Sequence, residues 1–168
     1  MNEKAKIIAE KLGLQPHPEG GYFKEIYRAE EKIGNPELPE RFSGDRNFST
    51  SIYFMLSGNE KSHFHRIKSD EIWHFYSGTT LVLHLIDAAG NYSTVKIGND
   101  ILAGETPQAF IPHGNWFAAE VEDKNSYALV GCTVSPGFDF ADFELATQKE
   151  LCEKYPEYSE LIKVFTKA

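Results

Sequence analysis

The sequence has few cysteines, a deficit of basic residues and no long apolar run. Its two cysteines, Cys132 and Cys152, each lack a second cysteine at metal-ligand spacing. Two thiols make no disulfide framework, so we expect them to be reduced and buried. Lys and Arg number 17 against 25 Asp and Glu, which gives a formal net charge of −8. With no basic stripe to neutralise phosphates, we expect no nucleic-acid partner.

Membrane and export signals are also missing from the sequence. No apolar run approaches the ~20 residues that a membrane-spanning helix needs, so we expect no membrane partner. Charged residues are spread over residues 1–11, which lack the apolar core of a signal peptide. We therefore expect a cytoplasmic protein. Walker-type phosphate loops, dinucleotide-binding glycine fingerprints and Gly-x-Ser-x-Gly motifs are absent as well.

What the chain does contain is a series of short apolar and aromatic segments separated by turn residues. Such regular strands predict an antiparallel sandwich or barrel. Helical spacing is confined to the ends, at 2–12, 145–154 and 158–165. We predict one mainly β domain, with a barrel over about 21–140 and a helical tail over about 144–166. The expected strands cover 22–29, 51–56, 72–76, 81–86, 92–97, 109–112, 116–121 and 127–134, and 33–47 reads as a loop.

Two histidines and a carboxylate form the densest group of candidate site residues. His63 and His65 lie two apart, so in a strand they would share a face. Glu71, Trp73 and Phe75 would share a face of the next strand. If the two faces meet across a hairpin, two imidazoles and one carboxylate converge, which suits a divalent transition metal.

The spacing of this group resembles the first sequence motif of the cupin superfamily. Gly58 precedes His63-Phe64-His65, and Glu71 and Gly78 follow. There is one residue fewer before the first histidine, and one more before the glutamate, than the motif has. The second cupin motif is similar to Gly104 followed by Pro112-His113-Gly114, which puts Phe117 where the fourth metal ligand would be. Phenylalanine cannot coordinate a metal, so the resemblance implies at most the three ligands His63, His65 and Glu71.

A narrower resemblance covers more than 120 residues. The chain is similar to the cupin-5 family, a domain of unknown function with the jelly-roll fold of dTDP-4-dehydrorhamnose 3,5-epimerase (RmlC). The resemblance implies a double-stranded β-helix, a homodimer and a ligand pocket inside the barrel. The segments that carry it are His17-Pro18-Glu19-Gly20-Gly21-Tyr22-Phe23, Ser51-Ile52-Tyr53-Phe54, His65-Arg66, Asp70-Glu71-Ile72-Trp73-His74-Phe75, Pro136-Gly137-Phe138 and Asp142-Phe143-Glu144.

Further residues are candidates for the pocket wall. In a small barrel, core and pocket wall are one surface, so Trp73, Phe75 and Phe117 are candidate ligand contacts. His84 lies in the middle of an apolar strand and would join them if it points inward. Arg66, like Arg28 and Arg46, could pair with a phosphate or carboxylate. His17 and His113 lie at turns and are weaker candidates.

Three hypotheses for function stay open at this point. The first is a metal-independent pocket that binds, or isomerises or epimerises, a sugar or nucleotide sugar. His65 would be its general base, Glu71 its orienter and Tyr53 its acid. The second is a metal-dependent isomerase or dioxygenase that uses His63, His65 and Glu71. The third is a non-enzymatic protein that binds a small, flat, anionic ligand.

Overall fold

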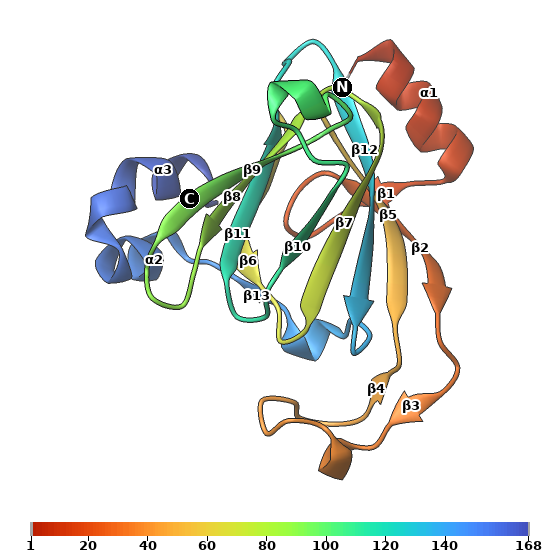
Figure 1. Cartoon of the computed structure of the whole chain (residues 1–168), viewed down its shortest axis with the longest axis vertical. Coiled ribbons are helices and arrows are strands. Elements are labelled where there is room, and N and C mark those ends of the chain that lie inside the picture. Colours follow the sequence, from red (N-terminus) through yellow and green to blue (C-terminus); the bar gives the residue numbers. More distant parts are fainter. Residues whose placement is uncertain (1, 168) are drawn as a thin grey trace.

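The computed structural model describes residues 2–167 and shows two antiparallel sheets packed face to face (Figure 1). One sheet has the strand order β1-β2-β5-β12-β7-β10, and the other has the order β13-β6-β11-β8-β9. The strands are β1 (Gln15–Pro16), β2 (Tyr22–Arg28), β5 (Thr50–Ser57), β6 (Lys61–Arg66), β7 (Asp70–Gly78), β8 (Leu81–Ile86), β9 (Tyr92–Ile97), β10 (Gln108–Ile111), β11 (Trp116–Val121), β12 (Tyr127–Ser135) and β13 (Glu144–Leu145).

The main core lies between the inner faces of the two sheets. Alternate residues along each strand point inward, as the two-residue repeat of a strand requires. Phe54, Trp73 and Cys132 reach the core from the six-stranded sheet, and Leu83 and Phe117 reach it from the five-stranded one. This arrangement confirms the predicted mainly β, double-stranded β-helix with helices at its two ends.

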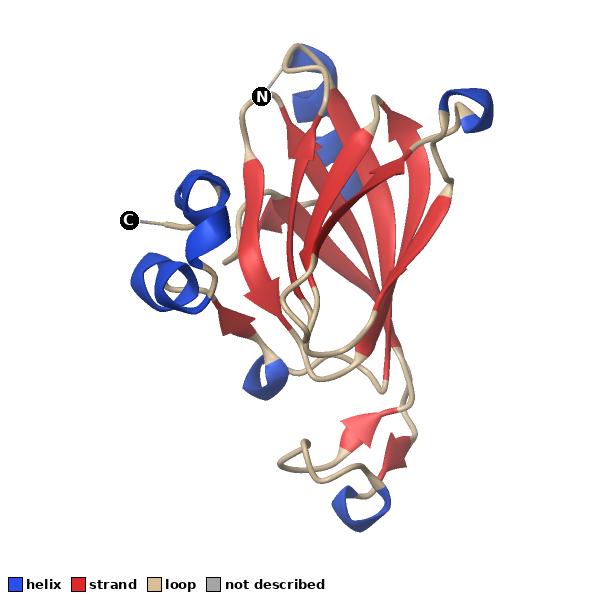
Figure 2. Ribbon diagram, turned by 60° about the vertical axis from the view of Figure 1, so that its left-hand side comes forward, coloured by secondary structure: helices blue, strands red, loops and turns tan. Residues whose placement is uncertain are grey.

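The helices cover the outer faces of the barrel (Figure 2). Helix α1 (Glu3–Leu12) is capped by the Asn2 side chain and ends at Gly13, which has a φ of 67°. Its buried face packs against the six-stranded sheet. Helices α2 (Gln148–Lys154) and α3 (Ser159–Val164) pack on the outside of the five-stranded sheet, around Phe64 and Trp116. No helix among residues 2–167 is long and apolar enough to cross a membrane.

The segment predicted as a loop over 33–47 is partly ordered by strand pairing. Strands β3 (Lys32–Ile33) and β4 (Arg46–Asn47) form a two-stranded ladder, with the 3₁₀ turn η1 (Asn35–Glu37) between them. We call residues 32–47 the arm, because Figure 1 shows them projecting beyond the end of the barrel, below β2 and β5. Two further 3₁₀ turns, η2 (Ile101–Ala103) and η4 (Pro156–Tyr158), lie in connections, and a third, η3 (Phe140–Asp142), follows β12.

Candidate functional site

A cavity of about 260 Å³ opens into the barrel between the sheets. Its volume lies just below the ~300–1,000 Å³ of pockets that hold drug-sized ligands, so it suits a small molecule. The ionisable side chains in its wall are His17, Glu19, Glu25, Arg28, His65, Glu71 and Asp139. The aromatic side chains in its wall are Phe23, Phe54, Trp73, Phe138, Phe140 and Phe143.

Glu71 lies on β7 and faces the cavity with only 7% of its surface exposed. The indole nitrogen Nε1 of Trp73 donates a hydrogen bond to its Oε1 at 3.0 Å, and the Cys132 thiol lies beside it. Among residues 2–167, no basic side chain forms an ion pair with this carboxyl group. Burial therefore raises the pKa of Glu71 to about 7, with the charge of Glu19 adding to the rise and that of His65 opposing it.

His65 and Glu19 form a buried ion pair at the same cavity. His65 Nε2 lies 3.0 Å from Glu19 Oε2, and His65 Nδ1 lies 2.8 Å from the carbonyl oxygen of His63. A carbonyl oxygen only accepts, so Nδ1 carries a hydrogen, and Nε2 donates to the carboxylate. Burial opposes the charge on His65, but Glu19 outweighs it and the pKa of His65 is raised. The pKa of Glu19 is lowered, because His65, His17 and Ser62 outweigh its own burial.

A β-bulge in β6 decides which side chains reach Glu19. Opposite β11, Phe117 pairs with His65 and Ala119 pairs with Ser62, so β6 has one residue more than its partner. The extra residue reverses the alternation, and Ser62 takes the inward position that regular pairing would give to His63. The Ser62 hydroxyl donates to Glu19 Oε1 at 2.8 Å. The ring of His63 instead meets the Glu19 carbonyl oxygen through Nδ1, at 2.6 Å, outside the cavity.

Glu19 reaches the barrel on a tight turn over residues 17–21. Gly20 and Gly21 both have positive φ, 110° and 72°. A Cβ atom on Gly20 would lie 2.1 Å from the Lys61 carbonyl oxygen, so only glycine lets the turn approach β6 this closely. The sequence predicts no site role for Glu19, which belongs there only to a segment that carries the family resemblance. The sequence signal for this site is an acidic residue placed between a proline and two glycines.

His17, treated in the sequence as a weaker candidate, lines the cavity on the same turn. Its Nδ1 lies 3.3 Å from Glu19 Oε2, and its ring packs edge-on against Phe23 with centroids 4.5 Å apart. Burial is the largest influence on its pKa and lowers it, so His17 is neutral at pH 7. The turn thus supplies a neutral imidazole beside the charged His65–Glu19 pair.

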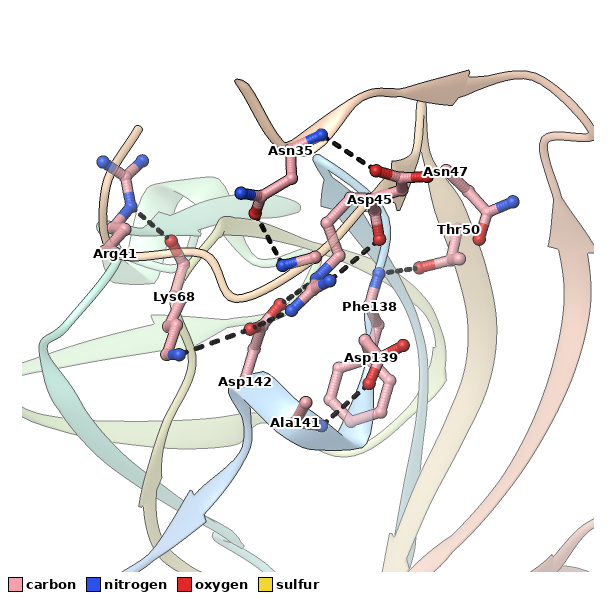
Figure 3. A network of polar contacts seen from close by, with 12 residues as sticks. Asn35, Arg41, Asp45, Asn47, Thr50, Lys68, Phe138, Asp139, Ala141 and Asp142 are labelled. Carbon is pink, nitrogen blue, oxygen red and sulfur yellow. Dashed lines mark hydrogen bonds and ion pairs between the residues drawn. The ribbon is translucent and has the colours of Figure 1, made fainter. Parts of the chain in front are cut away.

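A polar network holds the segment that follows β12 against the mouth of the cavity (Figure 3). Residues 138–143, which include η3, supply three phenylalanines to the cavity wall. Arg46 of the arm binds Asp142 through two hydrogen bonds of 2.6 Å each, and both side chains are buried. Lys68 Nζ lies 3.7 Å from Asp142, and the Phe138 amide donates to Thr50 Oγ1 at 2.9 Å. The arm and the cavity wall are therefore tied by a buried ion pair.

Comparison with known proteins decides the family. The family model described as Cupin superfamily (DUF985), the cupin-5 family, matches residues 6–146. The chain belongs to the cupin-5 family. An uncharacterized protein of Saccharomyces cerevisiae, YML079W, is 31% identical over 138 residues, which cover 77% of this chain and 68% of the yeast protein.

Solved structures agree with this membership. Protein SO0799 from Shewanella oneidensis is 37% identical, with a TM-score of 0.87 and 97% of each chain covered. A hypothetical protein from Leishmania major is 36% identical, with a TM-score of 0.87 and coverage of 98% of this chain and 99% of that one. Oxalate decarboxylase from Bacillus subtilis shares the fold alone, at 15% identity and a TM-score of 0.55, and this chain covers 36% of it.

Within this cupin, five of the candidate residues taken from the sequence line the cavity. They are His17, Arg28, His65, Glu71 and Trp73. Phe117 is fully buried beneath them, with its ring centroid 4.0 Å from that of His65. Phe75 follows Trp73 inward but packs against the core beyond the cavity. The residue that orients His65 is Glu19, and not Glu71 as the sequence predicts.

Two other predicted site residues, Tyr53 and Arg66, point away from the interior of the barrel. Tyr53 alternates with Ile52 and Phe54, which line the cavity, so its ring points outward and packs edge-on against Tyr76. It cannot serve as the acid of this cavity. Arg66 is held over the Trp116 ring and bonded to Glu144 on the outer surface.

His84 also points away from the cavity. Leu83 and Leu85 on either side of it belong to the inner core, so the two-residue repeat turns His84 to the outer face. There its Nδ1 shares a hydrogen bond of 2.8 Å with the Tyr92 hydroxyl, and its ring packs against Phe165.

The residues of the cupin motifs do not fit a metal site in this member of the family. His63 is turned outside the cavity by the bulge, and His65 has both ring nitrogens occupied by Glu19 and a carbonyl oxygen. The fourth motif position is Phe117. Within residues 2–167, no group of three His, Cys, Asp or Glu side chains is arranged to hold a metal ion. The predicted ligand set His63, His65 and Glu71 is therefore not assembled.

Proposed function

We propose that this cupin binds a small, sugar-sized molecule inside its barrel and moves protons to and from it at Glu71, without a metal. The observation that carries the proposal is the position of Glu71. It is a buried carboxyl group in the wall of an aromatic cavity, with the Trp73 indole and the Cys132 thiol as neighbours and no ion-pair partner among residues 2–167. A pKa of about 7 lets such a group both take and return a proton near neutrality.

The reaction class that suits this arrangement is isomerisation of a hydroxycarbonyl compound. The Glu71 carboxylate takes a proton from the hydroxyl-bearing carbon beside the carbonyl, which gives an enediolate. The Glu71 carboxylic acid returns that proton to the former carbonyl carbon, while the hydroxyl hydrogen passes to the former carbonyl oxygen and the former hydroxyl oxygen becomes the new carbonyl. No other reactant is consumed. The neutral His17 faces the same cavity and is available to hold the carbonyl oxygen. The pair His65–Glu19 stays charged and keeps the pocket wall fixed.

The proposal is tested by deuterium exchange, which needs no knowledge of the product. A panel of free aldoses and ketoses is incubated with the protein in D₂O, and loss of carbon-bound ¹H signals is followed by NMR. We expect exchange on at least one sugar with the wild type. We expect none with Glu71→Gln and full exchange with Glu122→Gln, which alters an exposed carboxylate paired with Lys96. Exchange that persists in Glu71→Gln would contradict the proposed role of Glu71.

Binding without turnover is the second candidate function. It is favoured by a specific observation, namely that Tyr53 points outward and His65 has no free ring nitrogen. Glu71 and His17 are then the buried or half-buried acid and imidazole of the wall that remain to exchange protons. Sugars that raise the melting temperature of the wild type but show no deuterium exchange would support this alternative.

A further inference from the structure

The balance of charge in the cavity wall points to the kind of ligand that it accepts. Four carboxyl groups line the cavity, from Glu19, Glu25, Glu71 and Asp139. The positively charged groups there are Arg28 and the imidazolium of His65. The wall therefore has more acidic groups than basic ones.

Both positive groups are already bonded to carboxylates of the chain. Arg28 binds Glu25 through two hydrogen bonds, of 3.0 and 2.7 Å, and its remaining nitrogen donates to Asn47 and to the Phe138 carbonyl oxygen. His65 binds Glu19 and the His63 carbonyl oxygen. An anionic ligand would have to break one of these pairs, which would leave a carboxylate in the wall without its partner.

The acidic groups that remain are Glu71 and Asp139. Glu71 is buried at the cavity, accepts a hydrogen bond from the Trp73 indole and lies beside the Cys132 thiol, and both of these neighbours are uncharged. Asp139 accepts a hydrogen bond from the amide of Ala141, at 2.8 Å, and caps η3. No salt bridge to either residue is formed within residues 2–167. Asp139 is exposed, whereas the Glu71 carboxylate is buried and costly to leave unpaired. A cationic ligand can supply the partner that the described residues do not give to Glu71.

The rest of the wall is aromatic. Six Phe and Trp side chains surround the space in front of Glu71. Ring faces attract cations, and the attraction strengthens when water is excluded, as in pockets that recognise ammonium groups. Aromatic walls and an unpaired acid thus favour the same ligand charge.

We propose that the ligand of this cavity carries an amine or ammonium group, which lies among the aromatic rings and pairs with Glu71. The inference rests on the proposed function and names its substrate class as a small organic cation, such as an amino sugar. Nucleotide sugars and other anions are then poor ligands, in contrast to what the fold resemblance implies.

The test compares three probes of one shape, which differ in charge. Benzylamine, benzyl alcohol and benzoate are titrated into the protein by calorimetry at about pH 8. We expect benzylamine to bind about tenfold or more tightly than benzyl alcohol, and benzoate to bind most weakly. Glu71→Gln should abolish the preference for the amine and keep the binding of benzyl alcohol. Glu122→Gln, a matched change on the surface, should leave the order unchanged.

Two outcomes would overturn the inference. One is equal or reversed affinities of the wild type for the three probes, and the other is no benzylamine binding at millimolar concentration. Melting temperatures of both variants show whether they are folded, and a Glu71→Asp variant keeps the charge if Glu71→Gln does not fold. Deuterium exchange on glucose but not on glucosamine would refute the amine while the proposed role of Glu71 survives. Amine preference without exchange on any sugar would refute proton transfer alone.

Discussion

Folding changes the protonation of Glu71, a carboxyl group buried in the barrel. Its pKa rises from an ordinary 4.5 to about 7 on folding, mainly through burial. Between these values the folded chain holds a proton that the unfolded chain has lost, so stability falls as the pH rises through this range. Above about pH 7 the loss is complete.

We therefore expect Glu71→Gln to gain stability relative to the wild type as the pH rises. Glutamine keeps the shape without titrating, so the difference in unfolding free energy should shift in its favour by on the order of 2 kcal/mol between about pH 5 and pH 8. Urea unfolding of both proteins at the two pH values measures the shift. A difference that does not change with pH would mean that Glu71 ionises in the folded protein as it does in water.

The outward positions of Tyr53 and His84 follow from their neighbours in the strand. Ile52 and Phe54 flank Tyr53, and Leu83 and Leu85 flank His84. In each case the neighbours two apart are apolar, so strand alternation already predicted that the polar residue between them points outward. Both side chains were assigned by their chemistry, while the phase of the strand decides which face they occupy.

At the scale of elements, each strand range that the sequence predicts matches an observed strand with small errors at its ends, whereas β1, β6 and β13 lie outside those ranges. The predicted ranges 81–86, 92–97 and 116–121 match β8, β9 and β11. Short apolar runs between turn residues are a local signal, which explains this success. The bulge in β6 is different, because it arises from pairing with β11, a strand some fifty residues later. The sequence of β6 alone therefore could not predict that Ser62, and not His63, points into the barrel.

The Arg46–Asp142 pair is the contact on which the position of η3 depends. Both side chains are about 4% exposed and bonded through two hydrogen bonds. Removing one partner of a buried pair leaves the other charge uncompensated, so Asp142→Asn should cost about 3–5 kcal/mol of unfolding free energy. Urea unfolding measures it.

The exposed pair of Lys96 and Glu122, 2.6 Å apart, provides the matched control for this prediction. Glu122→Gln should cost less than about 1 kcal/mol, because water screens the pair. A double variant, Arg46→Met with Asp142→Leu, should cost less than Asp142→Asn alone. Equal costs for Asp142→Asn and Glu122→Gln would show that the arm is not held by this pair.

At the scale of the whole molecule, the outer edge of β2 is open. Strand β5 pairs with one side of β2, and on the other side β1 pairs only with Tyr22 and Phe23. Among residues 2–167, the outer side of 24–28 therefore has no strand partner. Ile26 and Tyr27 lie there with 45% and 55% of their surface exposed. Exposed apolar edges favour pairing with another chain. We propose that two copies of this cupin associate along this edge.

Sedimentation velocity at micromolar concentration tests the association. We expect the wild type to sediment as a dimer and Ile26→Lys as a monomer, because lysine on an edge strand opposes pairing. Leu102→Lys, in η2 at a fully exposed site, should remain a dimer. A wild type that sediments as a monomer would contradict the proposal, as would a dimer that survives Ile26→Lys.

The bulge in β6 also means that a substitution and a deletion in this strand have different effects on the cavity. Because an additional residue in β6 turns position 63 out of the cavity, no substitution at that position can deliver a ligand atom to the interior. A shortened β6 would restore the alternation and bring its histidines to one face. To bring the histidines of the first cupin motif into the cavity, a residue of β6 must be deleted before any side chain is replaced.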